Sequence, residues 1–240
     1  MLNDPTTTPR SRWANKARSR GAIGALREVL FAVVRWSGIA AAVHAAVSRR
    51  VSVLVYHDPP PSLLERHLEY LSKHYRFLAL GDLVDALHAR DWRRIPPKSV
   101  VLTFDDGHRG NADLLPLFRR YGVRPTIFIC SQLVGTNRHF WFSGASDPEA
   151  LKRLPNDERL VRLERETGFS PTREYPTNER QTLSRAEIEQ MKEHVDFASH
   201  TRFHPLLPSC TDEECEVEIR ESKAEVERLT GEPCRHFSHS

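Results

Sequence analysis

The sequence predicts an α/β fold in which parallel strands alternate with helices. From residue 51 onward, short apolar segments rich in β-prone residues alternate with segments whose apolar residues recur at helical spacing. Side chains that can bind metals follow three of the predicted strands, and in parallel sheets chemistry collects at the carboxyl ends of the strands. These side chains are His57, Asp105 with Asp106, and His200 with His204.

The apolar segments predict five strands and the start of a sixth, and turn residues separate them from their neighbours. We expect the first strand to be buried, since it is almost wholly apolar. The predicted strands span residues 52–57, 76–80, 99–104, 124–130, 195–200 and 234–240.

Helices are predicted between these strands, where apolar residues lie three or four positions apart. The predicted helices span residues 62–75, 81–90, 111–122, 184–194 and 211–231. Polar residues suited to capping precede three of them, and a glycine ends two of them. The expected N-caps are Ser62, Ser184 (with Glu187 completing a capping box) and Thr211, and the expected terminal glycines are Gly122 and Gly231.

An irregular, charged insertion is predicted at about 136–183, with one helix over either 147–154 or 157–166. Within it, Trp141 and Phe142 are open to two interpretations. Aromatic rings suit the faces of sugars, so these residues could line a glycan groove, or they could belong to the core.

The charge of the chain is unevenly distributed. The formal net charge is +3, but residues 1–50 hold nine Lys/Arg against two Asp/Glu, and the other 190 residues hold 26 basic against 30 acidic residues. A protein that binds nucleic acid through its folded body would carry a basic stripe there. The pattern therefore argues against a nucleic-acid partner.

Residues 1–50 predict a basic tail followed by an amphipathic helix. The stretch 29–47 is largely apolar, but its central Arg35 would cost roughly 2.5–3.5 kcal/mol inside a bilayer, which argues against a membrane span. A signal peptide fits poorly as well, because no cleavage site of small residues stands out before the first strand. Residues 25–50 are expected either to contact a membrane peripherally or to cover the surface of the domain.

Four cysteines are present and none forms a C-x-x-C pair. We expect reduced or buried thiols, with a disulfide between two of them as the alternative. Reduced thiols favour a cytoplasmic location, or a peripheral one on the membrane. The cysteines are Cys130, Cys210, Cys215 and Cys234.

The segment VVLTFDDGHRGN, residues 100–111, places two carboxylates at the end of a predicted buried strand. Burying an unpaired carboxylate is costly, so the pair needs a partner, a metal or a catalytic role. The simpler alternative is that Asp105 and Asp106 cap the helix that follows. Gly107 would permit the tight turn after the strand.

His200 and His204 lie four residues apart directly after another predicted strand. On a helical turn both imidazoles would lie on one side. A catalytic zinc takes three protein ligands and keeps one position for water, and these histidines with one aspartate would supply that set. The second aspartate would then accept the proton of the water.

These residues resemble the motifs of the polysaccharide deacetylase family, also called the NodB homology domain or carbohydrate esterase family 4. Residues 103–107 (TFDDG) are similar to its first motif, and residues 199–204 (SHTRFH) to its second, S/T-H-x-x-x-H. The surrounding segments are similar as well. The resemblance covers roughly residues 51–240 apart from the insertion, and two motifs in the right order make it specific.

The resemblance implies a distorted (β/α) barrel that follows an N-terminal helical extension. It implies a metal-dependent hydrolase that removes N-acetyl or O-acetyl groups from an acetylated polysaccharide or oligosaccharide. Asp105 resembles the catalytic base, and Asp106, His200 and His204 resemble the ligands of a divalent metal, typically Zn²⁺. His57 resembles a substrate-pocket histidine of the family, although a buried, hydrogen-bonded histidine is the simpler interpretation.

The third motif of the family reads F-R-x-P-Y or F-S-Y-P-Y, and here residues 237–240 (FSHS) align with its start. Ser240 stands where the family has proline, and the family's later motifs, with their general-acid histidine, have no counterpart in this sequence. A missing general acid commonly costs about 10²–10⁴-fold in rate. We therefore expect a truncated domain with an incomplete barrel, either active or catalytically impaired and limited to binding metal or glycan.

Overall fold

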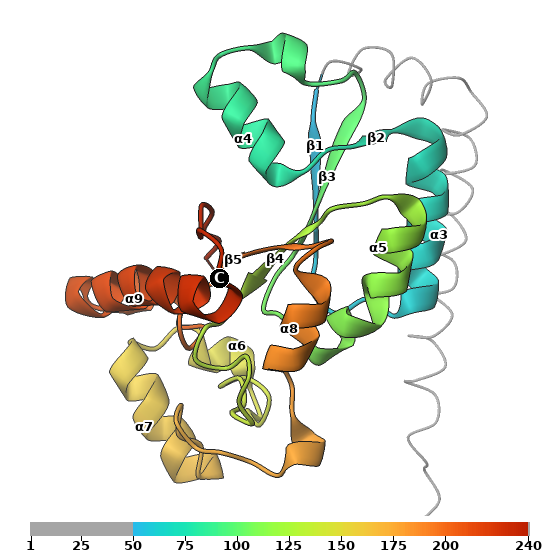
Figure 1. Ribbon diagram of the computed structural model, residues 1–240. Coiled ribbons are helices and arrows are strands. Elements are labelled where there is room, and N and C mark those ends of the chain that lie inside the picture. Colours follow the sequence, from blue (N-terminus) through green and yellow to red (C-terminus); the bar gives the residue numbers. More distant parts are fainter. Residues whose placement is uncertain (1–49, 240) are drawn as a thin grey trace, which may run out of the picture. The chain divides into compact units, whose positions relative to one another are not determined.

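The computed structural model describes residues 50–239 (Figure 1). In this part of the chain, the strands form one parallel sheet in the order β1-β3-β4-β5, with β2 also paired to β3. The α/β class is confirmed, and the sheet that these residues form is open. The strands are β1 Ser52–Tyr56, β2 Arg76–Phe77, β3 Ser99–Phe104, β4 Thr126–Ile129 and β5 Asp196–Ser199.

β3 is the buried centre of the sheet and positions the site. All six of its residues are buried. β1 pairs along its length, while β2 and β4 pair with its two ends. The register continues through β4 to β5, where Ile129 lies opposite Ser199. The carboxyl ends of β3, β4 and β5 therefore lie side by side, which brings residue 105 close to residue 200.

Helices cover the sheet and bury its apolar side chains. In Figure 1, α3, α5 and α8 lie on one side of the strands and α4 lies on the other. Leu64 and Leu68 of α3 pack with Phe118 of α5 and Phe104 of β3, and each fully buried side chain of this kind stabilises the fold by about 1.5–3 kcal/mol. The α-helices are α3 Pro61–His74, α4 Leu80–His88, α5 Leu115–Tyr121, α6 Pro148–Leu151, α7 Asn156–Thr167, α8 Arg185–Met191 and α9 Asp212–Thr230.

Short 3-10 helices and two isolated bridges complete the described structure. One bridge joins His108 to Thr182, and the other joins Phe237 to Ser199 of β5. The second bridge stands where the sixth strand was expected at 234–240. The 3-10 helices are η1 Trp92–Arg94, η2 Arg109–Leu114, η3 Thr177–Glu179 and η4 Leu207–Ser209.

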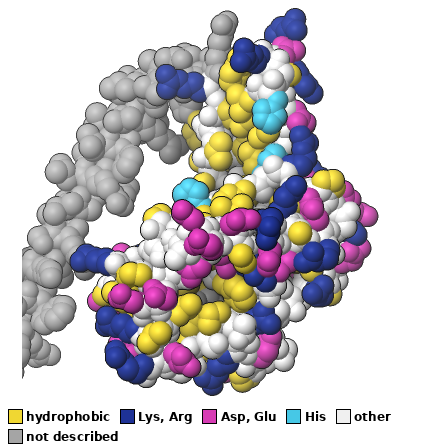
Figure 2. All heavy atoms as spheres, turned by 90° about the vertical axis from the view of Figure 1, so that its left-hand side faces the viewer, with side chains coloured by type: hydrophobic (Ala, Val, Ile, Leu, Met, Phe, Trp, Pro, Cys, Tyr) yellow, Lys and Arg dark blue, Asp and Glu magenta, His cyan; other side chains and the backbone are white. Residues whose placement is uncertain are grey.

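The prediction that the first strand is buried is wrong. Val53 and Val55 are 49% and 56% exposed, because alternate side chains of a strand point to opposite faces and, among the described residues, Leu54 and Tyr56 are the β1 side chains that pack against the core. Figure 2 shows hydrophobic side chains gathered on the upper part of the surface that it presents. Apolar composition thus identified the strand but not which of its faces is covered.

Two helix predictions also need correction. Ser62 is not an N-cap, because α3 begins one residue earlier at Pro61, where the missing N–H of proline costs no hydrogen bond. In the insertion both candidate segments are helical, as α6 and α7, rather than one of them. The predicted caps Ser184 and Thr211 do form capping boxes, and Gly122 and Gly231 do end their helices.

The predicted basic tail and amphipathic helix lie outside the described residues, apart from Arg50. Within residues 50–239, none of the helices combines the length and the apolar character that a membrane crossing requires. All four cysteines are free thiols, and Cys130 and Cys234 are buried.

Candidate metal centre

Asp106, His200 and His204 come together at the carboxyl ends of β3 and β5. Their potential ligand atoms all lie within 4.8 Å of one another. Oδ1 of Asp106 is 3.3 Å from Nε2 of His200 and 3.0 Å from Nε2 of His204. Two segments far apart in the sequence thus contribute one compact set of potential ligands.

A tight turn aims Asp106 at the histidines. The N–H of Gly107 donates to the carbonyl oxygen of Asp105 at 2.9 Å, which closes a three-residue turn around Asp106. Both Asp106 and Gly107 have left-handed backbones, with φ of +72° and +71°. Such a conformation costs a non-glycine residue about 1–3 kcal/mol, and residues of this kind tend to cluster at functional sites.

The two histidines do not lie on a helical turn, which corrects the expectation from their spacing. The loop is irregular, and φ is +67° at Thr201 and +61° at His204. Instead of joining a helix, the N–H groups of Arg202 and Phe203 donate to Oε2 of Glu218 at 2.7 and 3.1 Å. This carboxylate of α9 fixes the loop between the histidines.

Hydrogen bonds also set the orientation of the imidazole of His200. Its Nδ1 lies 3.0 Å from the carbonyl oxygen of Ser238. Because a carbonyl oxygen only accepts, Nδ1 is the donor, and in the neutral imidazole Nε2 then has a free lone pair. That lone pair is available to a cation at the point where Asp106 and His204 converge.

The residues at this point fit a divalent metal. Oδ1 of Asp106 is buried and makes no hydrogen bond of good geometry, although two imidazole nitrogens lie near it. A buried acceptor left without a hydrogen bond costs about 1–3 kcal/mol. A cation held by all three groups would remove this cost, and one carboxylate with two imidazoles is a donor set typical of zinc.

The two neighbouring aspartates have different electrostatic environments. Burial alone would raise the pKa of Asp106, but the neighbouring imidazoles of His108, His200 and His204 hold it well below its ordinary value. Burial raises the pKa of Asp105, an effect that nearby imidazoles, including His200, only partly oppose. Asp106 is therefore suited to be an ionised ligand and Asp105 to accept a proton.

The simpler interpretation of the aspartate pair, as helix caps, does not describe this site. The N-cap position of η2 is His108, and no side chain caps that helix. Gly107 has the conformation expected for the tight turn.

His57 is exposed, so the simpler interpretation of a buried, hydrogen-bonded histidine is wrong. Its carbonyl oxygen accepts a hydrogen bond from the Asn111 amide at 2.8 Å, and its imidazole lies near enough to Asp105 to lower the pKa of that carboxyl.

Trp141 is a core residue, 4% exposed, and its Nε1 donates to the His204 carbonyl oxygen. The Phe142 ring meets the His204 ring edge-on at 5.4 Å.

His108 was not predicted to be part of the site. Its Nε2 lies 3.0 Å from Oδ2 of Asp106, and its side chain lines an open cavity of about 460 Å³ together with Asp58 and Phe140. The only signal in the sequence was a histidine directly after the DDG turn.

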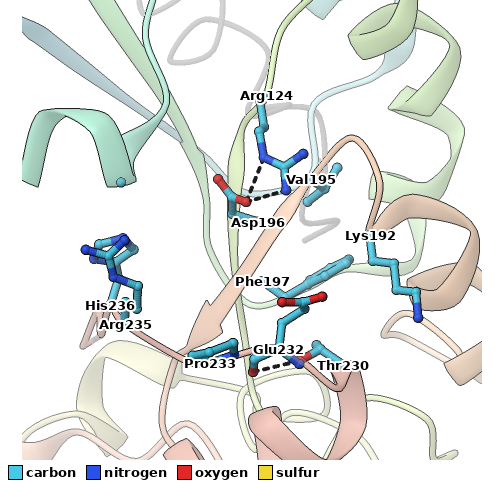
Figure 3. Close-up of a pocket in the computed structure, with 11 residues that line it drawn as sticks. Arg124, Lys192, Val195, Asp196, Phe197, Thr230, Glu232, Pro233, Arg235 and His236 are labelled. Atoms are coloured by element: carbon cyan, nitrogen blue, oxygen red, sulfur yellow. Dashed lines mark hydrogen bonds and ion pairs between the residues drawn. The ribbon is translucent and has the colours of Figure 1, made fainter. Parts of the chain in front are cut away.

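A second cavity, of about 300 Å³, lies at the amino-terminal ends of β4 and β5, at the opposite edge of the sheet (Figure 3). Arg124 and Asp196 point toward each other there, with 2.7 Å between Nη2 and Oδ1. Arg235, on the other side of the cavity, pairs with Asp85 of α4. Since these charges neutralise each other within the chain, the carboxyl edge is the better candidate for chemistry.

Known proteins resemble this chain in sequence and in fold. The polysaccharide deacetylase family model matches residues 93–239, more than half of the chain. YxkH of Bacillus subtilis (strain 168), which carries the name of a polysaccharide deacetylase, is 26% identical over 99 residues. That match covers 38% of this chain and 35% of YxkH, so the chain spans about a third of the length of this curated relative.

Solved structures share the fold at low sequence identity. The Streptococcus pyogenes deacetylase PplD, solved in complex with acetate, matches 78% of this chain and 72% of its own, with a TM-score of 0.54 and 17% identity. IcaB from Ammonifex degensii matches 79% of this chain and 73% of its own, with a TM-score of 0.54 and 18% identity. BC0361, a polysaccharide deacetylase from Bacillus cereus, matches 78% of this chain and 49% of its own, with a TM-score of 0.50 and 21% identity. These likenesses confirm the expected fold type.

Proposed function

The chain belongs to the polysaccharide deacetylase family, and from this premise we propose that it is a metal-dependent hydrolase that removes N-acetyl or O-acetyl groups from a polysaccharide. The observation that carries the proposal is the convergence of Asp106, His200 and His204 within 4.8 Å, with Asp105 beside them. The pattern of one buried ionised carboxylate next to a more basic one is that of a hydrolytic site.

Asp106, His200 and His204 would hold the metal, and zinc suits this donor set best. A bound divalent metal supplies Lewis-acid polarisation of the acetyl carbonyl and makes water more acidic. Asp105 takes a proton from the water that attacks the carbonyl carbon. The bond from that carbon to the sugar nitrogen or oxygen then breaks as the proton taken up by Asp105 passes, directly or through water, to that atom, which leaves acetate and the free sugar amine or hydroxyl.

The aromatic side chains around the histidines limit the access of water. The rings of Phe140 and Phe142 meet the imidazole of His204 edge-on, with centroids 5.9 and 5.4 Å apart. His57 is exposed near Asp105 and could contact the substrate. A drier site strengthens the interaction of Asp105 with the proton that it accepts.

Acetate release from N-acetylglucosamine oligomers and from O-acetylated glycans, with zinc supplied, tests the proposal. We expect Asp105→Asn to keep zinc binding but to reduce turnover by about 10²–10⁴-fold, as for the loss of a general base. Asp106→Ala should lose both zinc binding and turnover. Turnover unchanged in Asp105→Asn would remove that residue from the role of base.

A second candidate function is binding of metal or glycan without turnover. The open sheet favours it, because an unclosed barrel leaves one side of the site without a wall among the described residues. Zinc binding without acetate release from any of these glycans would support this alternative. Measurable turnover would exclude it.

A further inference from the structure

A third imidazole contacts Asp106, on the carboxylate oxygen that the other two do not face. Nε2 of His108 lies 3.0 Å from Oδ2, whereas His200 and His204 approach Oδ1. An ionised carboxylate only accepts hydrogen bonds, so Nε2 of His108 is the donor. Oδ2 thus has a hydrogen-bond partner, while Oδ1 has none.

The insertion holds His108 in this position. Its backbone forms an antiparallel bridge with Thr182. Two hydrogen bonds flank the bridge: one from the Arg109 N–H to Gln181 at 2.8 Å, and one from the Leu183 N–H to the carbonyl oxygen at position 107 at 2.9 Å. The imidazole packs against the ring of Phe140 with centroids 5.2 Å apart. Residues from both ends of the insertion therefore fix one side chain next to the site.

His108 is placed to orient a ligand rather than to be one. Among the described residues, the group that could hold a metal consists of Asp106, His200 and His204 and does not include it. A carboxylate that can rotate about its Cβ–Cγ bond presents either oxygen to a metal, and a donor on one oxygen removes that freedom. Removing a hydrogen-bond partner of a metal ligand commonly weakens metal binding by about 10–100-fold.

We propose that His108 is a positioning residue: it donates through Nε2 to Oδ2 of Asp106 and thereby points Oδ1 at the metal. The insertion at 136–183 serves this arrangement, since Phe140 and Thr182 fix the ring and the backbone of His108. The inference rests on the proposed metal site, and it adds a role for a residue next to the TFDDG motif.

The test is the dissociation constant of Zn²⁺, measured on the full chain by competition with a chromophoric chelator. His108→Phe keeps an aromatic ring against Phe140 but removes the donor, and we expect it to weaken zinc binding by about 10–100-fold. His108→Gln carries an amide N–H at nearly the same reach and should restore most of the affinity. His139→Phe is the matched control: that imidazole lies within the insertion, stacks on Tyr175 and donates through Nε2 to the carbonyl oxygen of Glu179, so the change also removes a donor but not one to Asp106.

Each outcome decides the inference. Equal losses in His108→Phe and His108→Gln, or no loss in His108→Phe, would overturn the role of the donor while leaving the metal site intact. A comparable loss in His139→Phe would show a general effect of the insertion and would overturn it too. If the wild-type chain binds no zinc, the proposed function fails first, and this inference fails with it.

Discussion

Gly107→Ala perturbs the turn that carries Asp106, and its cost can be worked out from the structure. The φ of +71° costs an alanine roughly 1–2 kcal/mol. The new Cβ would lie 2.7 Å from Cγ2 of Ile129 and 3.3 Å from Cγ1 of Val134, closer than the 3.5–4.0 Å or so at which carbon atoms pack. Both neighbours are buried, so relieving the overlap costs about 1–3 kcal/mol more.

We therefore expect Gly107→Ala to lower the free energy of unfolding by about 2–5 kcal/mol. Urea unfolding of the metal-free chain measures this change. Gly122→Ala is the matched control: φ is +62° there, but an added Cβ meets no atom within 4 Å, so only the backbone cost of roughly 1–2 kcal/mol applies.

Gly107→Ala should also weaken zinc binding. The carbonyl oxygen of Ile129 accepts a hydrogen bond from the N–H of His200 at 3.0 Å, so pushing Ile129 away displaces a ligand. Gly122→Ala, at the far end of α5, should leave zinc affinity unchanged. If Gly107→Ala proved as stable as Gly122→Ala, the packing argument would be refuted.

Four further outcomes are expected. Glu218→Ala should destabilise the metal-free chain in urea unfolding by roughly 1–3 kcal/mol for each of the two loop N–H groups left without an acceptor, whereas Glu218→Gln, which keeps an acceptor, should cost less. Although burial alone would raise the pKa of Glu187, hydrogen bonds from Arg180 and Ser184 lower it, so the stability that this carboxylate contributes is present above pH 4.5, its ordinary pKa, and is lost as the pH falls through the lowered value. Glu187→Gln should flatten this acid side of the stability profile, and an unchanged profile would contradict the assignment. Thr211→Ala removes the cap of α9 and should cost about 1 kcal/mol, measured by thermal unfolding. Zinc at a hundred times its dissociation constant should add about 2.7 kcal/mol to the free energy of unfolding, and no gain would contradict a site in the folded chain.

Features that depend on a few neighbouring residues could be predicted from the sequence. The capping box of Ser184 and Glu187 is a contact between residues three positions apart, and the left-handed backbone of Gly107 follows from a glycine at a strand end. The grouping of Asp106 with His200 could be expected as well, because parallel strands bring their carboxyl ends together.

Features that depend on distant partners could not be predicted. His204 departs from a helical turn because Glu218, on a later helix, takes the N–H groups of the preceding residues. The exposure of Val55 depends on which face of β1 other elements cover. The role of His108 depends on an insertion that the sequence marked only as irregular.

The site concentrates unfavourable features that the surrounding fold must offset. Asp106, Thr201 and His204 all have positive φ, and the buried Oδ1 of Asp106 lacks a hydrogen bond. None of these would persist in an isolated turn, since each costs free energy that no interaction within the turn offsets. They persist here because β3 is buried along its whole length and because Glu218 holds the histidine loop. Because the buried strand and Glu218 fix Asp106 and the histidine loop, little binding energy would be lost in ordering these side chains around a metal.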